Sequence, residues 1–172
     1  EVGQGARDLQ NAAFIALGTG IGGAFVINGR LLRGAHGGAG EIGYVPLWRI
    51  AAPGVASLEE QVGEAGIRRA YVAAGGDTDH SVLDIFAAAG EGSDLASHIL
   101  DQAGEHVARA VLAVLALLDP DLIVFGGSIG ARPEFIARVE RLVTAAWPRP
   151  ITIARSQSGG RAGLLGALEL SR

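Results

Sequence analysis

Residues 14–41 read FIALGTGIGGAFVINGRLLRGAHGGAGE, and this stretch decides the fold of the chain. Residues 14–17 and 24–27 are short apolar runs bounded by glycine, a pattern that indicates buried strands rather than a helix. The glycine-rich residues between them form a turn, and Asn28-Gly29 is a strong hairpin signal that leads into a third strand at residues 30–32. The stretch therefore predicts a three-stranded antiparallel meander.

The first turn contains Gly18-x-Gly20-x-x-Gly23, which has the spacing of a dinucleotide-binding fingerprint, and Glu41 follows about 20 residues later. We interpret this match as accidental, because a strand and a hairpin follow where a dinucleotide site needs a helix. Glycines still allow backbone N–H groups and the Thr19 hydroxyl to approach a phosphate closely. On the pattern alone, a plain glycine-rich turn is the stronger interpretation.

Three segments together change that balance: LGTGIGG at 17–23, NGRLLRG at 28–34 and GGAGEIG at 37–43. They resemble the ROK family of sugar kinases and sugar-responsive transcriptional repressors, and the resemblance covers nearly the whole chain. It implies an α/β fold, an actin-like, ribonuclease H-like lobe whose mixed sheet is covered by helices. It also implies that Gly18, Thr19 and Gly20 contact the phosphates of ATP and that Glu41 accepts hydrogen bonds from sugar hydroxyls.

Composition narrows the classes of protein that fit. The chain has 172 residues and a formal net charge of -4, which favours a single globular domain and gives no basic surplus for nucleic-acid binding. It has no cysteine, which excludes disulfides and thiolate metal sites within it. No run is long and apolar enough to span a bilayer and no secretion signal is present, so a cytoplasmic location without membrane contact is expected.

The first residue is Glu1 rather than Met, and the resemblance places the catalytic aspartate and a further phosphate loop of the family before it. We therefore expect residues 1–172 to be the C-terminal ROK domain of a longer protein, without a catalytic residue of its own. By resemblance the protein forms homo-oligomers and would contact DNA only through a domain outside this segment.

Many ROK members carry a zinc site built from one histidine and three cysteines. At the matching positions this chain has Tyr44, Ile50, Ala52 and Ser57, none of which supplies an imidazole or thiolate, so no zinc is expected. The histidine of that site also helps to hold the sugar, which makes Tyr44 a candidate sugar contact. By the same resemblance Glu59 accepts hydrogen bonds from sugar hydroxyls. The alternative is a helix start, since Ser57 and Glu60 form a capping box that leaves Glu59 unassigned.

The remaining chain reads as helices with two further strands. Residues 44–47 suggest a short strand, and 66–74 and 81–89 suggest two short helices, the second capped by Ser81. The longest helix begins at 93–94 and ends at Asp119-Pro120. Residues 121–128 read as a buried strand that runs into a Gly-Gly turn, and a helix follows at 133–146. A strand at 151–153 precedes a closing helix at 162–170. The spacing of His98 and His106 does not suit one metal ion, and both are expected to be solvated.

Gly126 and Gly127 form the turn that follows this strand. The segment resembles the adenosine-side motif of the ROK family, so the two glycines are candidate nucleotide contacts, although an ordinary strand-to-helix connection would have the same residues. The replacement of all four zinc positions favours a sugar-sensing domain of a ROK-type transcriptional regulator that binds a small-molecule sugar. The alternative is the C-terminal lobe of a sugar kinase that uses ATP with Mg²⁺. A third interpretation is a fold retained only for assembly, and the combination of Gly18, Thr19, Gly20 and Glu41 argues against it.

Overall fold

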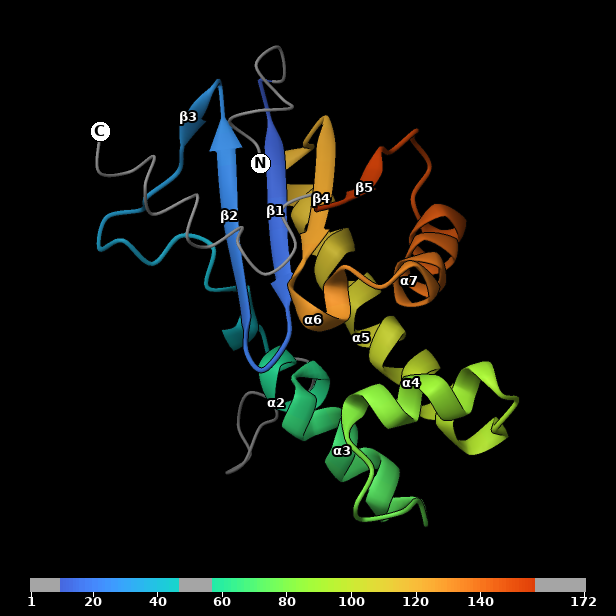
Figure 1. The fold of residues 1–172 in the computed structure, drawn as a ribbon. Coiled ribbons are helices and arrows are strands. Elements are labelled where there is room, and N and C mark those ends of the chain that lie inside the picture. Colours follow the sequence, from blue (N-terminus) through green and yellow to red (C-terminus); the bar gives the residue numbers. More distant parts are fainter. Residues whose placement is uncertain (1–9, 47–56, 157–172) are drawn as a thin grey trace.

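A computed structural model describes residues 10–46 and 57–156 (Figure 1). Its centre is a five-stranded mixed sheet with the order β3-β2-β1-β4-β5. The first three strands pair antiparallel, whereas β4 pairs parallel with β1 and β5 pairs parallel with β4. The strands are β1 (Ala12–Leu17), β2 (Ile21–Ile27), β3 (Arg30–Leu31), β4 (Leu122–Gly126) and β5 (Ile153–Arg155). The predicted meander is confirmed.

The sequence explains these strands locally. Ala13, Ile15 and Leu17 alternate along β1 and are buried in the core, as the two-residue period of a strand requires. Asn28 and Gly29 have positive φ values of 52° and 71°, the conformation that a tight hairpin turn between β2 and β3 needs.

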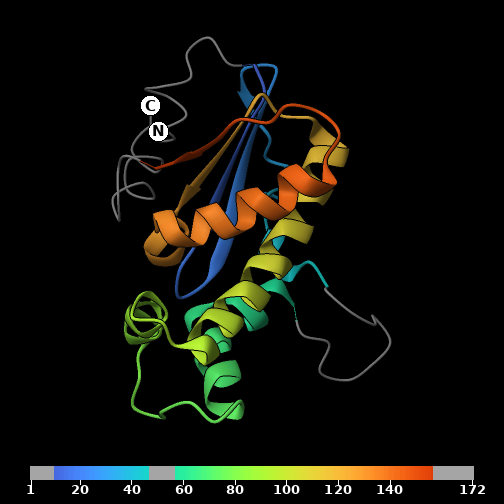
Figure 2. The same cartoon turned by 90° about the vertical axis from the view of Figure 1, so that its right-hand side faces the viewer.

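Helices cover one face of the sheet and extend beyond its lower end (Figures 1 and 2). The long helix α5 runs along the sheet and packs against α7, while α2, α3 and α4 pack against α5 beside the β1–β2 turn. The helices are η1, a 3-10 turn (Ile42–Tyr44), α2 (Leu58–Val62), α3 (Glu64–Ala73), α4 (Val82–Gly90), α5 (Asp94–Leu118), α6 (Gly127–Gly130) and α7 (Pro133–Ala146).

Most helix ends lie where the sequence places them. Ser57 and Ser81 each form a complete capping box, with Glu60 and Asp84 respectively. Asp119 adopts a left-handed φ of 42° and ends α5, and Pro120 follows. The helix predicted at 133–146 is confirmed with both bounds as α7.

Several predicted elements are wrong or displaced. Residues 44–46 do not form a strand, because the N–H groups of Tyr44 and Val45 donate to the carbonyls of Glu41 and Ile42 and close the 3-10 turn η1; Pro46 makes a single bridge to Ser57. The helix start that the capping box of Ser57 and Glu60 offers as an alternative is present as α2. The helix predicted from residue 66 begins at residue 64, and the strand predicted at 151–153 lies at 153–155. Within residues 121–128 the predicted strand is β4, and the short helix α6 begins at Gly127, in the predicted Gly-Gly turn.

The helix expected at 162–170, as well as residue 47, lies outside the described residues. In the part of the chain that the structure describes, no helix combines the length and apolar character that crossing a membrane requires.

Candidate functional site

The Gly18-Thr19-Gly20 turn joins β1 to β2 at the edge of the sheet where the parallel strands β1 and β4 end (Figure 1). Ligands commonly bind at this edge of an α/β sheet. The Gly18 N–H donates to the Gly20 carbonyl at 3.0 Å, whereas no acceptor among the described residues pairs with the N–H of Thr19 or Gly20. These two donors are therefore available to an anionic ligand.

The start of α6 forms one wall beside this turn. Gly127 has a φ of +83°, and a Cβ at this position would lie well under 3.0 Å from the carbonyl oxygen of Leu17. Only glycine therefore allows α6 to lie this close to the end of β1. A Cβ on Gly18 would meet the Ser128 hydroxyl at 3.0 Å. The structure thus brings the predicted residues Gly18, Thr19 and Gly20 next to Gly126 and Gly127, which lie more than a hundred residues later in the sequence.

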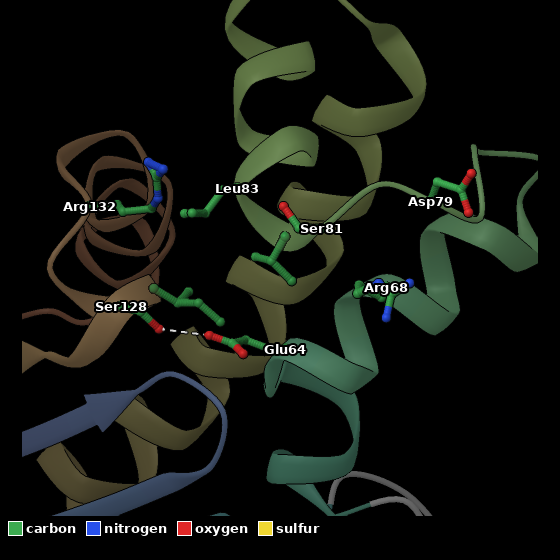
Figure 3. Close-up of a pocket in the computed structure, with 9 residues that line it drawn as sticks. Glu64, Arg68, Asp79, Ser81, Leu83, Ser128 and Arg132 are labelled. Atoms are coloured by element: carbon green, nitrogen blue, oxygen red, sulfur yellow. Dashed lines mark hydrogen bonds between the residues drawn. The ribbon is translucent and has the colours of Figure 1, made fainter.

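The first residue of α3, Glu64, closes the junction from the other side. Its backbone N–H donates to the Gly18 carbonyl at 3.1 Å. One carboxylate oxygen accepts a hydrogen bond from the Thr19 hydroxyl at 3.1 Å, and the other accepts one from the Ser128 hydroxyl at 3.0 Å. Figure 3 shows Glu64 and Ser128 pointing toward one another from opposite sides. Sequence reasoning assigned no role to Glu64, and the Thr19 hydroxyl predicted to reach a phosphate is paired with it.

A pocket of about 470 Å³ opens beside this junction (Figure 3). Its volume lies within the range of small-molecule sites. Both arginines that line it are already paired: the Arg68 guanidinium donates to the carbonyls of His80 at 2.9 Å and Thr78 at 3.0 Å, and Arg132 forms an ion pair with Glu134 at 2.9 Å. The lining residues are Glu64, Arg68, Asp79, Ser81, Val82, Leu83, Ser128, Ile129 and Arg132.

Glu59, a predicted sugar contact, supports the same turn from α2. One of its carboxylate oxygens accepts a hydrogen bond from the Ile21 N–H at 2.8 Å. A Cβ on Gly20 would meet this oxygen at 2.9 Å, and one on Gly43 would meet it at 3.4 Å. Glu59 therefore lies between the glycine turn and η1. The capping box uses Glu60, as the sequence indicates, and Glu59 has a separate structural contact that the sequence does not reveal.

Close backbone packing places the loop that carries Glu41. Gly40 has a φ of +98°, and a Cβ there would lie under 3.0 Å from the Gly23 carbonyl oxygen on β2. Glu41 directly precedes η1, which packs against α2 and β2, so the loop of Glu41 and the side chain of Glu59 lie on the same side of the sheet edge. The Glu41 side chain is exposed, and Tyr44 is 79% exposed. The roles of Glu41, Glu59 and Tyr44 in binding sugar stay predictions.

The residues at the junction fit ATP with Mg²⁺, the cofactor that the resemblance implies. The backbone N–H groups of Thr19 and Gly20 suit phosphate oxygens. The carboxylate of Glu64 and the hydroxyls of Thr19 and Ser128 are hard oxygen donors of the kind that Mg²⁺ prefers. The described residues contain no group of three or more His, Cys, Asp or Glu side chains that could hold a metal ion. Of the four zinc positions, residues 50 and 52 lie outside the described part of the chain.

The two histidines of α5 differ in exposure. His98 is exposed, as expected, but His106 is partly buried, so its predicted solvation is wrong. Burial lowers the pKa of His106 below its usual 6.5, and the nearby Arg109 lowers it further, while Glu105 opposes the shift.

Comparisons with known proteins extend over the whole chain. A sequence model of the ROK family matches residues 1–172. The bifunctional enzyme NanE/NanK of Brucella melitensis is 34% identical over 97% of this chain and 32% of its own length. The N-acetylmannosamine kinase of Salmonella typhi is 32% identical over 96% of this chain and 58% of its own length. The chain therefore spans between a third and three fifths of these curated relatives.

Solved structures agree with this result. A ROK family protein from Streptococcus pneumoniae in complex with sucrose superposes with a TM-score of 0.84 at 32% identity, covering 94% of this chain and 57% of that one. A ROK family transcriptional regulator, a homologue of the E. coli MLC protein, gives a TM-score of 0.73 at 26% identity, covering 87% of this chain and 42% of that one. The actin-like α/β fold predicted from the sequence is confirmed. The relatives are mainly sugar kinases, which supports the kinase alternative more than the regulator first favoured.

Proposed function

The chain belongs to the ROK family, and from this premise we propose that it is the nucleotide- and sugar-binding lobe of an ATP-dependent sugar kinase. The observation that carries the proposal is the junction at the ends of β1 and β4, where two glycine motifs meet beside a pocket of about 470 Å³. The proposal concerns the intact protein, because the chain spans 58% of the Salmonella kinase.

We assign nucleotide binding to one side of the glycine turn and sugar binding to the other. The N–H groups of Thr19 and Gly20 donate to phosphate oxygens, and the side-chain-free backbone at Gly126 and Gly127 lets the nucleotide approach α6. Bound Mg²⁺ would neutralise charge on the transferred phosphoryl group. On the other side, Glu41 accepts hydrogen bonds from sugar hydroxyls and orients them.

The sugar we propose is N-acetylmannosamine, because several relatives are named as kinases of this sugar. The test is phosphoryl transfer from ATP to N-acetylmannosamine by the intact protein, together with calorimetric titration of the sugar against wild type and Glu41→Ala. A hydrogen bond to a charged group contributes about 1.5–3 kcal/mol, so the variant should bind the sugar about 10-fold to 150-fold more weakly.

Glu91→Gln serves as the matched control, since it removes an exposed carboxylate beyond the C-terminal end of α4. It should bind sugar as wild type does. The proposed function would be rejected if the intact protein transferred phosphate to no hexose and no N-acetylhexosamine while remaining folded.

A sugar-sensing regulator is the second candidate. It is favoured by the resemblance of the fold to a ROK transcriptional regulator and by Tyr44 and Ser57 at positions where many ROK members bind zinc. A regulator would bind the sugar without phosphoryl transfer, and the sugar would change its affinity for DNA through a domain outside this segment. Parallel measurements of sugar-dependent DNA binding and of phosphoryl transfer separate the two candidates.

A further inference from the structure

Glu64 creates an electrostatic problem for an ATP site. Its carboxylate lies where three elements meet, since it is bonded to Thr19 in the glycine turn and to Ser128 in α6 while forming the first residue of α3. A helix N-terminus normally favours an anion such as phosphate. Here a carboxylate already occupies the first turn and faces the pocket, and two like charges in one site repel each other.

The arginines of the pocket have other partners than Glu64. The guanidinium of Arg68 donates to the carbonyls of Thr78 and His80, which fixes it to the connection between α3 and α4. Arg132 is paired with Glu134 and lies 4.4 Å above the Phe86 ring. Asp79 adds a second carboxylate to the pocket lining. Neither guanidinium forms an ion pair with Glu64, so a cation bound with the polyphosphate would supply the counter-charge that this carboxylate lacks.

We propose that Glu64, together with the hydroxyls of Thr19 and Ser128, holds the divalent cation of the bound nucleotide, so that the site accepts the metal–nucleotide complex and rejects the free nucleotide. The inference rests on the proposed function and adds a role for one residue within that site. The donor set is suitable because Mg²⁺ usually binds through one or two carboxylates plus substrate phosphates and keeps several waters. The two hydroxyls, which now donate to Glu64, can turn their oxygen lone pairs toward a cation or its waters.

The test compares the affinity of the intact protein for ATP in the presence of Mg²⁺ and in the presence of EDTA, by calorimetric titration. Wild type should bind the Mg²⁺ complex about tenfold or more tightly than free ATP. Glu64→Gln keeps the shape of the side chain but removes its charge. It should bind free ATP more tightly and the Mg²⁺ complex more weakly, which brings the ratio close to one.

Two further variants control the experiment. Glu91→Gln removes an exposed carboxylate at the C-terminal end of α4, outside the pocket lining, and it should keep the cation preference of wild type. Glu64→Asp retains the charge on a shorter side chain and should also prefer the Mg²⁺ complex. Circular dichroism checks that each variant is folded.

Direct detection of the cation gives an independent readout. Electron paramagnetic resonance of Mn²⁺ bound with ATP should change in Glu64→Gln and stay as in wild type in Glu91→Gln. If Glu64→Gln keeps the full cation preference and the wild-type Mn²⁺ spectrum, the inference is wrong and Glu64 only clamps the three elements together. If Glu64→Gln weakens ATP binding equally with and without Mg²⁺ and leaves 2′-deoxy-ATP unaffected, the carboxylate contacts the ribose, which also overturns it.

Failure of the proposed function would look different. If wild type binds no nucleotide with or without Mg²⁺, both the proposed kinase and the role of Glu64 are rejected. If wild type binds nucleotide and transfers phosphate without any cation preference that depends on Glu64, only the role of Glu64 is rejected.

Discussion

Replacing Gly127 with alanine tests the close approach of α6 to β1 on which the candidate site depends. The φ of +83° at Gly127 is a left-handed conformation that costs an alanine about 1–2 kcal/mol. The added Cβ would also press against the backbone carbonyl of Leu17 at under 3.0 Å, and rotation of a side chain cannot relieve a clash with backbone. Displacing α6 should cost about 1–3 kcal/mol more.

We therefore expect Gly127→Ala to lower the free energy of unfolding by about 2–5 kcal/mol. Two glycines separate the contributions. Gly75 has a φ of +96°, but a Cβ added there would have nothing within 4 Å, so Gly75→Ala should show only the conformational cost of about 1–2 kcal/mol. Gly22 has neither feature, so Gly22→Ala should change stability by less than about 1 kcal/mol.

The assay is urea unfolding of the purified intact protein and its variants, followed by circular dichroism with linear extrapolation to water. Thermal melts give a second measure, since 1 kcal/mol corresponds to about 2–4 °C for a domain of 150–250 residues. Equal losses in Gly127→Ala and Gly75→Ala would refute the reasoning, because they would show that the approach of α6 to Leu17 relaxes without cost.

Three further predictions concern single side chains. Hydrogen bonds from Ser81 lower the pKa of Asp84 in the folded state. They therefore stabilise the folded protein fully above the ordinary pKa of 3.8, and this stabilisation is lost as the pH falls through the lower folded pKa. In urea unfolding measured below about pH 4, Asp84→Asn should abolish this loss of stability. Burial lowers the pKa of His106, so the unfolded state binds the proton more tightly and stability should fall as pH drops below 6.5; an imidazole that titrates at or above 6.5 by NMR would contradict this. Glu59→Ala leaves the Ile21 N–H without its acceptor and should cost about 1–3 kcal/mol in urea unfolding, whereas Glu59→Gln, which keeps a carbonyl acceptor, should cost less; equal losses would show that the hydrogen bond is not the cause.

The parts of the fold that local sequence decides could be predicted. Asn28-Gly29 specifies the hairpin between β2 and β3 by its positive φ values, and Asp119-Pro120 ends α5 because neither residue continues the helix. The error at residues 44–46 has a local cause as well. An apolar run after glycine suggests a strand, but its N–H groups find acceptors three residues back and close a 3-10 turn instead.

In the candidate site, the glycine motifs could be recognised from the sequence, whereas the role of Glu64 could not. Gly18, Gly20 and Gly127 stand out in the sequence because backbone approach requires glycine. Glu64 does not stand out, because a carboxylate in the first turn of a helix is ordinary there. Its two hydroxyl partners lie 45 and 64 residues away, so their contact depends on how β1, α3 and α6 pack together. A local pattern contains no information about such a contact.

Two acidic side chains on consecutive helices fix the conformation of the turn formed by Gly18, Thr19 and Gly20. Glu59 of α2 accepts the Ile21 N–H on one side of the turn, and Glu64 of α3 accepts the Thr19 hydroxyl on the other. Gly63 separates the two helices, and a Cβ there would meet the Thr19 carbonyl at 2.9 Å, so the junction of α2 and α3 lies directly against the turn. Glu59 lies beside η1, the loop side proposed for the sugar, while Glu64 lines the pocket proposed for the nucleotide. The glycine turn therefore separates the side proposed for the sugar from the side proposed for the nucleotide, and α2 and α3 contact it through Glu59 and Glu64. Because both acids contact the same short turn, a ligand that displaces one of them should also move the backbone beside the other ligand.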